Sequence, residues 1–187
     1  MIFLVLCIIP LSIIAEIPLF SHTDIEIVEL EQQYIQQAKE IFYHIVYEFQ
    51  LMPCSTIQDV QHHFIRIGVC KDYDDANGYY FNNRGTFLVV LHQGKVVGTG
   101  AFKFFDDTTC ELKRFYFFPE YRSKGLGSTL MLSLIDRART FGYKKIILEV
   151  YNPIKQYAAI NFYKQWGFYE IAAYRESNAQ LQMELKL

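Results

Sequence analysis

The chain has 187 residues, of which 51% are hydrophobic and 17% aromatic, enough to bury one sizeable core but short for two full domains. Its 18 basic and 20 acidic residues give a formal net charge of −2 and are spread without a block of like sign. This balance offers no electrostatic basis for binding nucleic acid, so we expect no nucleic-acid partner.

The first 20 residues form an apolar leader, and we expect residues 21–187 to form a single domain. Met1–Ala15 is apolar except for Ser12, and it carries no Lys or Arg. The apolar run before Glu16 is shorter than the ~20 residues that a membrane-spanning helix needs. The leader fits a cleaved signal, a short membrane anchor, a segment packed on the domain, or a misassigned start codon. The sequence leaves these four interpretations open.

The cysteines indicate a reducing compartment. They show no C-x-x-C pair and no spacing typical of zinc. The adjacent His62 and His63 diverge on either a helix or a strand, so we expect no metal site. Isolated thiols favour a cytoplasmic location. A membrane-associated or secretory location remains the alternative, and it depends on the leader alone. The cysteines are Cys7, Cys54, Cys70 and Cys110.

The first part of the domain is expected to be one strand followed by helices. Ile25–Leu30 alternates apolar and acidic residues, which is typical of a strand. Glu31–Phe49 repeats apolar residues at three- and four-residue steps, the pattern of an amphipathic helix. Ile57–Ile67 is predicted to form a second helix. The polar segment Lys71–Gly78 is predicted to be a turn that ends this part.

Three antiparallel strands are predicted next, namely Thr86–His92, Lys95–Phe104 and Thr109–Phe118. Pro119 then ends the third strand, and a helix from Leu126 to Gly142 leads into a buried strand. A strand, helix, strand unit of this length predicts that the Thr109 and Lys145 strands run parallel. The remaining elements are that buried strand, one helix and two closing strands: Lys145–Val150, Ile154–Gln165, Phe168–Tyr174 and Gln180–Leu187.

A glycine-rich loop, Arg122-Ser123-Lys124-Gly125-Leu126-Gly127, lies between the third strand and its helix. Glycines at such a turn let successive N–H groups point into one concavity, and the helix N-terminus adds partial positive charge. A pyrophosphate could bind there, with Arg122 and Lys124 adding charge. The simpler alternative is a turn that caps the helix and binds no ligand.

The run from Glu111 to Gly127, ELKRFYFFPEYRSKGLG, resembles the signature of the GNAT superfamily of N-acetyltransferases, whose loop pattern is Arg/Gln-x-x-Gly-x-Gly/Ala. Leu148-Glu149, Ala159–Tyr163 and Trp166–Phe168 resemble its next strand and helix. The resemblance implies an α/β (α+β) fold with a mixed, mostly antiparallel sheet of about six or seven strands, flanked by helices. Two splayed parallel strands would form the cleft for coenzyme A.

The resemblance also implies a set of cofactor-binding residues for acetyl-CoA as co-substrate, without a metal. The pantetheine arm would bond to the strand backbone at Phe117 and Phe118, with the Phe117 N–H donating to the thioester oxygen. Asn152 would contact the coenzyme A arm from the loop after its strand. The positions matching the pyrophosphate loop are Arg122, Ser123, Lys124, Gly125, Leu126, Gly127 and Ser128.

Acylation of an amine needs an oxyanion donor and a proton for the leaving thiolate. Tyr163 matches the family tyrosine that supplies this proton; the alternative is a core phenol. Glu111 matches a general-base position where burial would raise the carboxyl pKa, and a cross-strand salt bridge is the alternative. By strand alternation, Lys113 lies on the same face of the strand as Glu111. A cation there would favour acceptors that carry a carboxylate. The alternative is that Lys113 lies on a solvated face of the strand.

The sequence therefore predicts an enzyme that transfers an acetyl group from acetyl-CoA to a primary amine of a small molecule or peptide by direct attack. One alternative is a catalytically inactive module that binds acyl-CoA. Another is an acetyltransferase tethered to a membrane through the leader. The acceptor, the acyl-chain preference and the oligomeric state are not encoded legibly.

Overall fold

The computed structural model describes residues 24–187. The four interpretations of the leader fall outside this range. Within residues 24–187, no helix combines the length and the apolar character needed to cross a membrane.

The described residues fold around one seven-stranded sheet in the order β1-β2-β3-β4-β5-β7-β6. All neighbouring strands are antiparallel except β4 and β5, which are parallel. The predicted mixed, mostly antiparallel sheet is therefore confirmed. The strands are β1 (Ile25–Glu29), β2 (Thr86–His92), β3 (Lys95–Asp106), β4 (Thr109–Phe117), β5 (Lys145–Val150), β6 (Tyr169–Ile171) and β7 (Leu181–Lys186).

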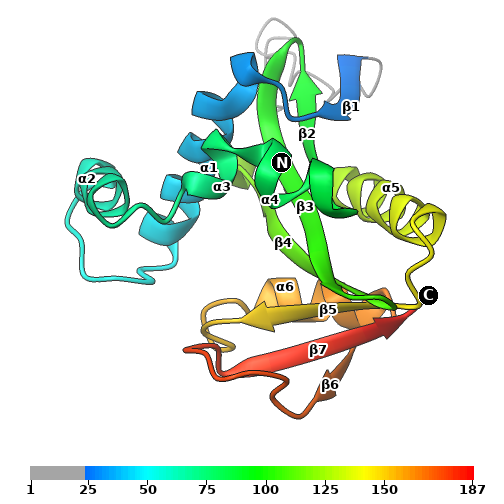
Figure 1. Ribbon diagram of the computed structural model, residues 1–187. Coiled ribbons are helices and arrows are strands. Elements are labelled where there is room, and N and C mark those ends of the chain that lie inside the picture. Colours follow the sequence, from blue (N-terminus) through cyan, green and yellow to red (C-terminus); the bar gives the residue numbers. More distant parts are fainter. Residues whose placement is uncertain (1–23) are drawn as a thin grey trace, which may run out of the picture.

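Helices cover the two faces of the sheet and create two hydrophobic cores. On one face α1 and α2 pack with the short helices α3 and α4 against β2 and β3. On the other, α5 and α6 pack against β3, β4, β5 and β7. Figure 1 shows α1 to α4 on one side of β2 to β4 and α5 on the other. The helices are α1 (Ile35–Glu48), α2 (Ile57–Ile67), α3 (Lys71–Asp74), α4 (Ala76–Tyr79), α5 (Leu126–Thr140) and α6 (Tyr157–Gln165).

Besides the strand expected over Phe168–Tyr174, of which only Tyr169–Ile171 forms β6, two segments differ from the sequence prediction. The expected turn at Lys71–Gly78 is wrong, because the segment forms α3 and α4, anchored by the buried Tyr73 and Ala76. The helix expected from Ile154 begins only at Tyr157, after a turn. Both differences arise because tertiary burial and local turn bonds override the local pattern.

The feature that positions the site is the short pairing between β4 and β5. Only three register pairs join them, from Thr109 with Lys145 to Glu111 with Ile147. Beyond these pairs the strands separate, and Figure 1 shows β5 and β7 turning away from β4. The predicted splay of the two parallel strands is confirmed.

A β-bulge bends β4 where it leaves β5. Between the pairs Ala101–Lys113 and Thr99–Tyr116, β4 has one residue more than β3. Arg114 takes the left-handed conformation, with φ of 55°, which is uncommon for a residue other than glycine. Its carbonyl accepts a hydrogen bond of 2.6 Å from the Thr99 hydroxyl.

A buried ion pair fixes this bulge to α3. The Arg114 Nε and Nη2 atoms donate to the two Asp72 oxygens at 2.9 and 2.8 Å. The guanidinium also lies 4.6 Å from the ring centroid of Phe42 and 4.8 Å from that of Tyr73. Tyr80 donates to Asp72 at 2.6 Å. Both carboxylate oxygens therefore accept hydrogen bonds, and the bend in β4 is tied to the helical layer.

Replacing Asp72 with alanine should lower the free energy of unfolding by roughly 3–5 kcal/mol, because it leaves the buried Arg114 charge without a partner. Urea denaturation measures this change. Asp74→Ala is the matched control, since Asp74 pairs with Lys39 at the surface and its loss should cost less than about 1 kcal/mol. Equal losses for the two variants would contradict the account of the bulge.

Candidate active site

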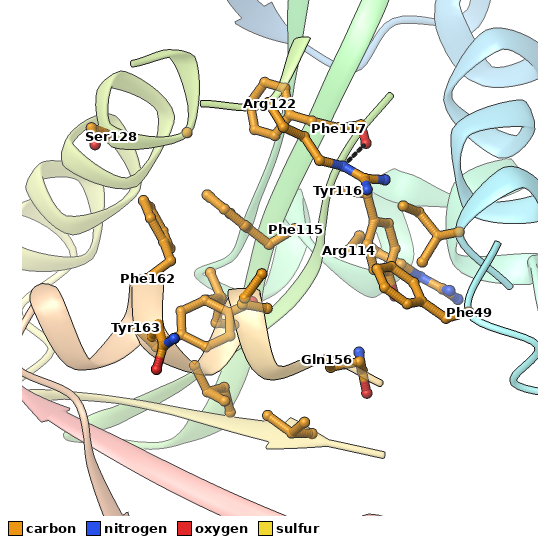
Figure 2. A pocket seen from close by; sticks show the side chains of 18 of the residues that line it. Phe49, Arg114, Phe115, Tyr116, Phe117, Arg122, Ser128, Gln156, Phe162 and Tyr163 are labelled. Atoms are coloured by element: carbon orange, nitrogen blue, oxygen red, sulfur yellow. Dashed lines mark hydrogen bonds between the residues drawn. The ribbon is translucent and has the colours of Figure 1, made fainter. Parts of the chain in front are cut away.

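A cavity of about 670 Å³ opens where β4 and β5 separate. Its walls are the unpaired part of β4, the end of β5, the loop before α5, one side of α6, and Ile45 and Phe49 near the end of α1. Of the predicted site residues, it gathers Phe117, Arg122, Ser123, Gly125, Gly127, Ser128 and Tyr163. Figure 2 shows Phe162 and Tyr163 on one side of the cavity and Phe49 and Arg114 on the other.

Aromatic rings form the wall on the side of α5 and α6. Phe115 stacks on Phe162 with centroids 5.5 Å apart, and it meets Tyr163 edge-on at 6.2 Å. Glycines on β3 make room for this wall, since a Cβ at Gly98 would meet the Phe117 ring at 2.3 Å. This wall makes the surroundings of the Tyr163 ring largely apolar.

Tyr163 is buried in this wall. Burial, with a smaller contribution from Tyr116, raises the pKa of the phenol well above its ordinary value. The phenol therefore keeps its proton at neutral pH. A protonated hydroxyl on the cavity wall is placed to donate a proton, but the raised pKa makes Tyr163 a weaker acid than an ordinary phenol.

Strand alternation decides which backbone groups of β4 face the cavity. The Phe118 N–H donates to the Val97 carbonyl on β3 at 3.2 Å, and the Phe118 carbonyl accepts from the Tyr121 N–H at 3.0 Å. Both backbone groups of Phe118 are therefore already bonded within the chain, which argues against the predicted contact of Phe118 with a ligand. Because neighbouring residues turn their N–H groups to opposite edges, those of Phe117 and Phe115 face the gap toward β5.

The loop before α5 has the shape expected for holding an anion. Ser123 and Gly125 have φ of 57° and 82°, so the chain curls before α5 begins at Leu126. Gly125 is the N-cap residue, and no side chain bonds to the N–H groups of the first turn there. By contrast, Thr56 and Asp59 form a complete capping box on α2. Leu126 sends its side chain into the core. The α5 N-terminus thus presents backbone N–H groups beside the cavity.

The two basic side chains of the loop are placed differently. The Arg122 guanidinium makes two 2.6 Å bonds to Glu48 of α1, and its Nε donates to the Phe117 carbonyl at 3.0 Å (Figure 2). It therefore ties α1 to the loop. Lys124 does not line the cavity, and its ammonium lies 5.8 Å from the ring centroid of Tyr121.

Asn152 shapes the turn between β5 and α6. Its side-chain oxygen accepts from the Lys155 N–H at 3.0 Å, and its own N–H donates to the Gln156 side chain at 3.0 Å. Gln156, rather than Asn152, lines the cavity. The predicted contact of Asn152 with the coenzyme A arm is not supported by this placement.

Glu111 lies outside the cavity lining, in an ion-pair cluster. Its carboxylate bonds to Lys113 at 3.2 Å, Lys103 at 3.4 Å and Arg175 at 2.5 Å. Burial raises its pKa, but Lys113, Arg175 and Lys103 together lower it below the ordinary value. The expected raised pKa is wrong, and the geometry favours the salt-bridge alternative. The contact with Lys113 confirms that these two side chains share a face.

Arg175 is a site residue that sequence reasoning missed. It comes from the loop between β6 and β7 and bonds to both Glu111 and Glu149. Glu111 is the last residue of β4 that pairs with β5, and Glu149 lies two residues beyond Ile147, the partner of Glu111 on β5. Arg175 therefore bridges the two strands where they begin to separate. No local motif could reveal it, because the contact depends on the register of three distant segments.

Metal ligands are not grouped in the described part of the chain: no three His, Cys, Asp or Glu side chains among residues 24–187 could share an ion. Cys54, Cys70 and Cys110 are free thiols.

Splayed parallel strands and a glycine-rich loop before a helix define the fold class of the N-acyltransferases that use acyl-CoA. The chain belongs to the Acetyltransferase (GNAT) family, whose model matches residues 51–168.

Individual relatives agree with this assignment. The chain is similar to the uncharacterized N-acetyltransferase YjgM of Escherichia coli, with 34% identity over 52% of this chain and 59% of that protein. It is 30% identical to human N-acetyltransferase 8 over 56% of this chain and 48% of that protein. The chain thus spans about half the length of these relatives.

Solved structures share the fold. An acetyltransferase from Streptococcus agalactiae has a TM-score of 0.74 and 24% identity, covering 88% of this chain and 99% of that one. The PaiA N-acetyltransferase from Thermoplasma acidophilum, in complex with coenzyme A, has a TM-score of 0.69 and 19% identity, covering 87% and 99%.

Replacing Arg175 with methionine should destabilise the protein at neutral pH by about 2 kcal/mol, less than for a fully buried pair because Lys113 and Lys103 remain. Without Arg175, burial should raise the carboxyl pKa values in the folded state. The folded state would then take up protons more readily than the unfolded state as pH falls. The difference in the free energy of unfolding between the variant and the wild type should therefore become smaller as the pH falls toward about 5.

Urea unfolding across pH measures this trend. Arg137→Met is the control, because it breaks an exposed pair with Glu29 and should give a small deficit at every pH. A deficit for Arg175→Met that grows as pH falls would contradict the assignment of the cluster.

Proposed function

We propose that this protein is an N-acetyltransferase that moves an acetyl group from acetyl-CoA to a primary amine by direct attack. The observation that carries the proposal is one continuous cavity. It joins the anion-binding loop at Gly125 to the open backbone edge of β4 and then to the Tyr163 phenol. The pyrophosphate, the pantetheine amides and the thioester of acetyl-CoA follow one another along the molecule, and they need an anion-binding loop, an open strand edge and a proton donor in that order.

The cofactor would enter along the aromatic wall. Its pyrophosphate would bind the N–H groups of residues 123–128, and its pantetheine amides would pair with the edge of β4 that β5 has left. The ring of Tyr163 meets Phe115, so a sulfur atom beside the phenol lies nearer to the Phe115 N–H than to that of Phe117. We therefore propose Phe115 as the donor to the thioester oxygen and Phe117 as a pantetheine contact.

The chemistry would then proceed in one transfer. The amine nitrogen attacks the thioester carbon, and the developing oxyanion is stabilised by the Phe115 N–H. The C–N bond forms, the C–S bond breaks, and the thiolate takes the Tyr163 proton. The nitrogen loses its own proton to solvent reaching the cavity, and solvent returns a proton to the Tyr163 phenolate, so the enzyme ends in its starting state. Glu111 as base remains a prediction, and its three cationic partners and lowered pKa argue against it.

Replacing Tyr163 with phenylalanine should keep the ring packing but remove the proton. We expect kcat to fall ~100-fold or more, with near-native melting temperature and Kd for coenzyme A. Tyr143→Phe is the control: Tyr143 is a buried phenol of the same core that bonds to the Arg84 carbonyl and does not line the cavity. Its kcat should be unchanged.

Steady-state kinetics with the best amine of a mixed panel make the test. Full kcat in Tyr163→Phe would show that the phenol is only part of the wall. Coenzyme A binding without turnover of any amine would favour the inactive-module alternative instead.

A further inference from the structure

A cluster of five charged side chains reaches the cavity lining at Lys113 and Glu149. Arg175 contacts both Glu111 and Glu149, and Lys113 lies 3.2 Å from Glu111 and 3.9 Å from Glu149. Lys103 completes the cluster at 3.4 Å from Glu111. Three cations against two carboxylates leave one positive charge in excess.

Burial decides which of these charges a ligand meets. The Glu111 and Glu149 side chains are only 0% and 2% exposed, whereas the cations above them are 27% to 37% exposed. The carboxylates therefore lie beneath the cations, and most of the exposed side-chain surface of the cluster belongs to the cations, although Glu149 also contributes to the cavity lining. Among the cations of the cluster, Lys113 lines the cavity.

The other two cations that line the cavity are already matched. Arg114 forms two bonds with Asp72, and Arg122 forms two bonds with Glu48. The excess charge of the cluster therefore reaches the cavity at Lys113.

Lys113 stands close to the position proposed for the thioester. It precedes Phe115 by two residues on β4, so their Cα atoms are at most about 7 Å apart. An acceptor whose amine reaches the thioester at Phe115 can place a group a few bonds away beside the Lys113 ammonium.

We propose that the acceptor carries a carboxylate within a few bonds of its reacting amine, as an α-amino acid or a short peptide does, and that Lys113 binds this carboxylate. The inference rests on the proposed function and names its substrate class. Polyamines and aminoglycosides bring further positive charges, which the cationic surface repels.

The experiment compares a free amino acid with its carboxamide, which has the same side chain and amine but no negative charge. In the wild-type enzyme, kcat/KM for the acid should exceed that for the amide by roughly tenfold or more, as expected for a charge-assisted hydrogen bond. Spermidine should be a poorer acceptor than either. This comparison needs no variant.

Lys113→Met should remove most of the preference for the acid while changing kcat/KM for the amide little. Lys103→Met is the matched control, because it removes the same charge from Glu111 but lies outside the cavity lining, and it should keep the preference. Melting temperature and coenzyme A affinity establish that both variants fold.

An amide or a polyamine acetylated as well as the acid would overturn this inference and leave the proposed function standing. Retention of the full preference in Lys113→Met would overturn the role of Lys113. Turnover of no amine at all would overturn the proposed function and this inference with it.

Discussion

The interaction on which the site depends is the pairing of β4 with β5, which stops after three residues. A longer ladder would fill the space between the strands with hydrogen bonds and leave no cavity. Stopping it leaves the N–H groups of Phe115 and Phe117 without a strand partner toward β5 within the described chain. Buried backbone groups without partners are costly, so this edge is suited to a ligand that carries amides of its own.

Two ion-pair systems maintain that separation from opposite ends. Arg114 and Asp72 fix the bulge to the helical layer, and Arg175 bridges the strands where they diverge. Neither system gains much net stability from its charges, because desolvation offsets attraction in a buried pair. Their effect is geometric: the loss of one partner would leave a buried charge, so the bend and the divergence are held at defined positions. The same cluster places Lys113 and Glu149 in the lining of the cavity.

Much of the fold and part of the site could be predicted from the sequence, at the positions where local chemistry decides the outcome. The strand expected at Thr86–His92, the helix expected at Ile57–Ile67 and the turn at Arg122–Gly127 that leads into a helix are all found in the structure. The bulge at Arg114 was not accessible, because nothing in its neighbours demands a left-handed arginine. Glu111 was assigned a raised pKa because burial could be foreseen from the strand pattern, whereas Arg175 and Lys103 reach it only through tertiary folding.

The central claim is that the loop before α5 binds the pyrophosphate of acetyl-CoA, and calorimetric titration tests it most directly. Gly125→Asp places a carboxylate where the phosphates are expected to lie. Gly142→Asp is the matched control, since its φ of 85° equals that of Gly125 within 3° and neither glycine has an atom within 4 Å of an added Cβ. The account predicts that coenzyme A binding is lost in the first variant and kept in the second. Equal affinity in two folded variants would contradict it.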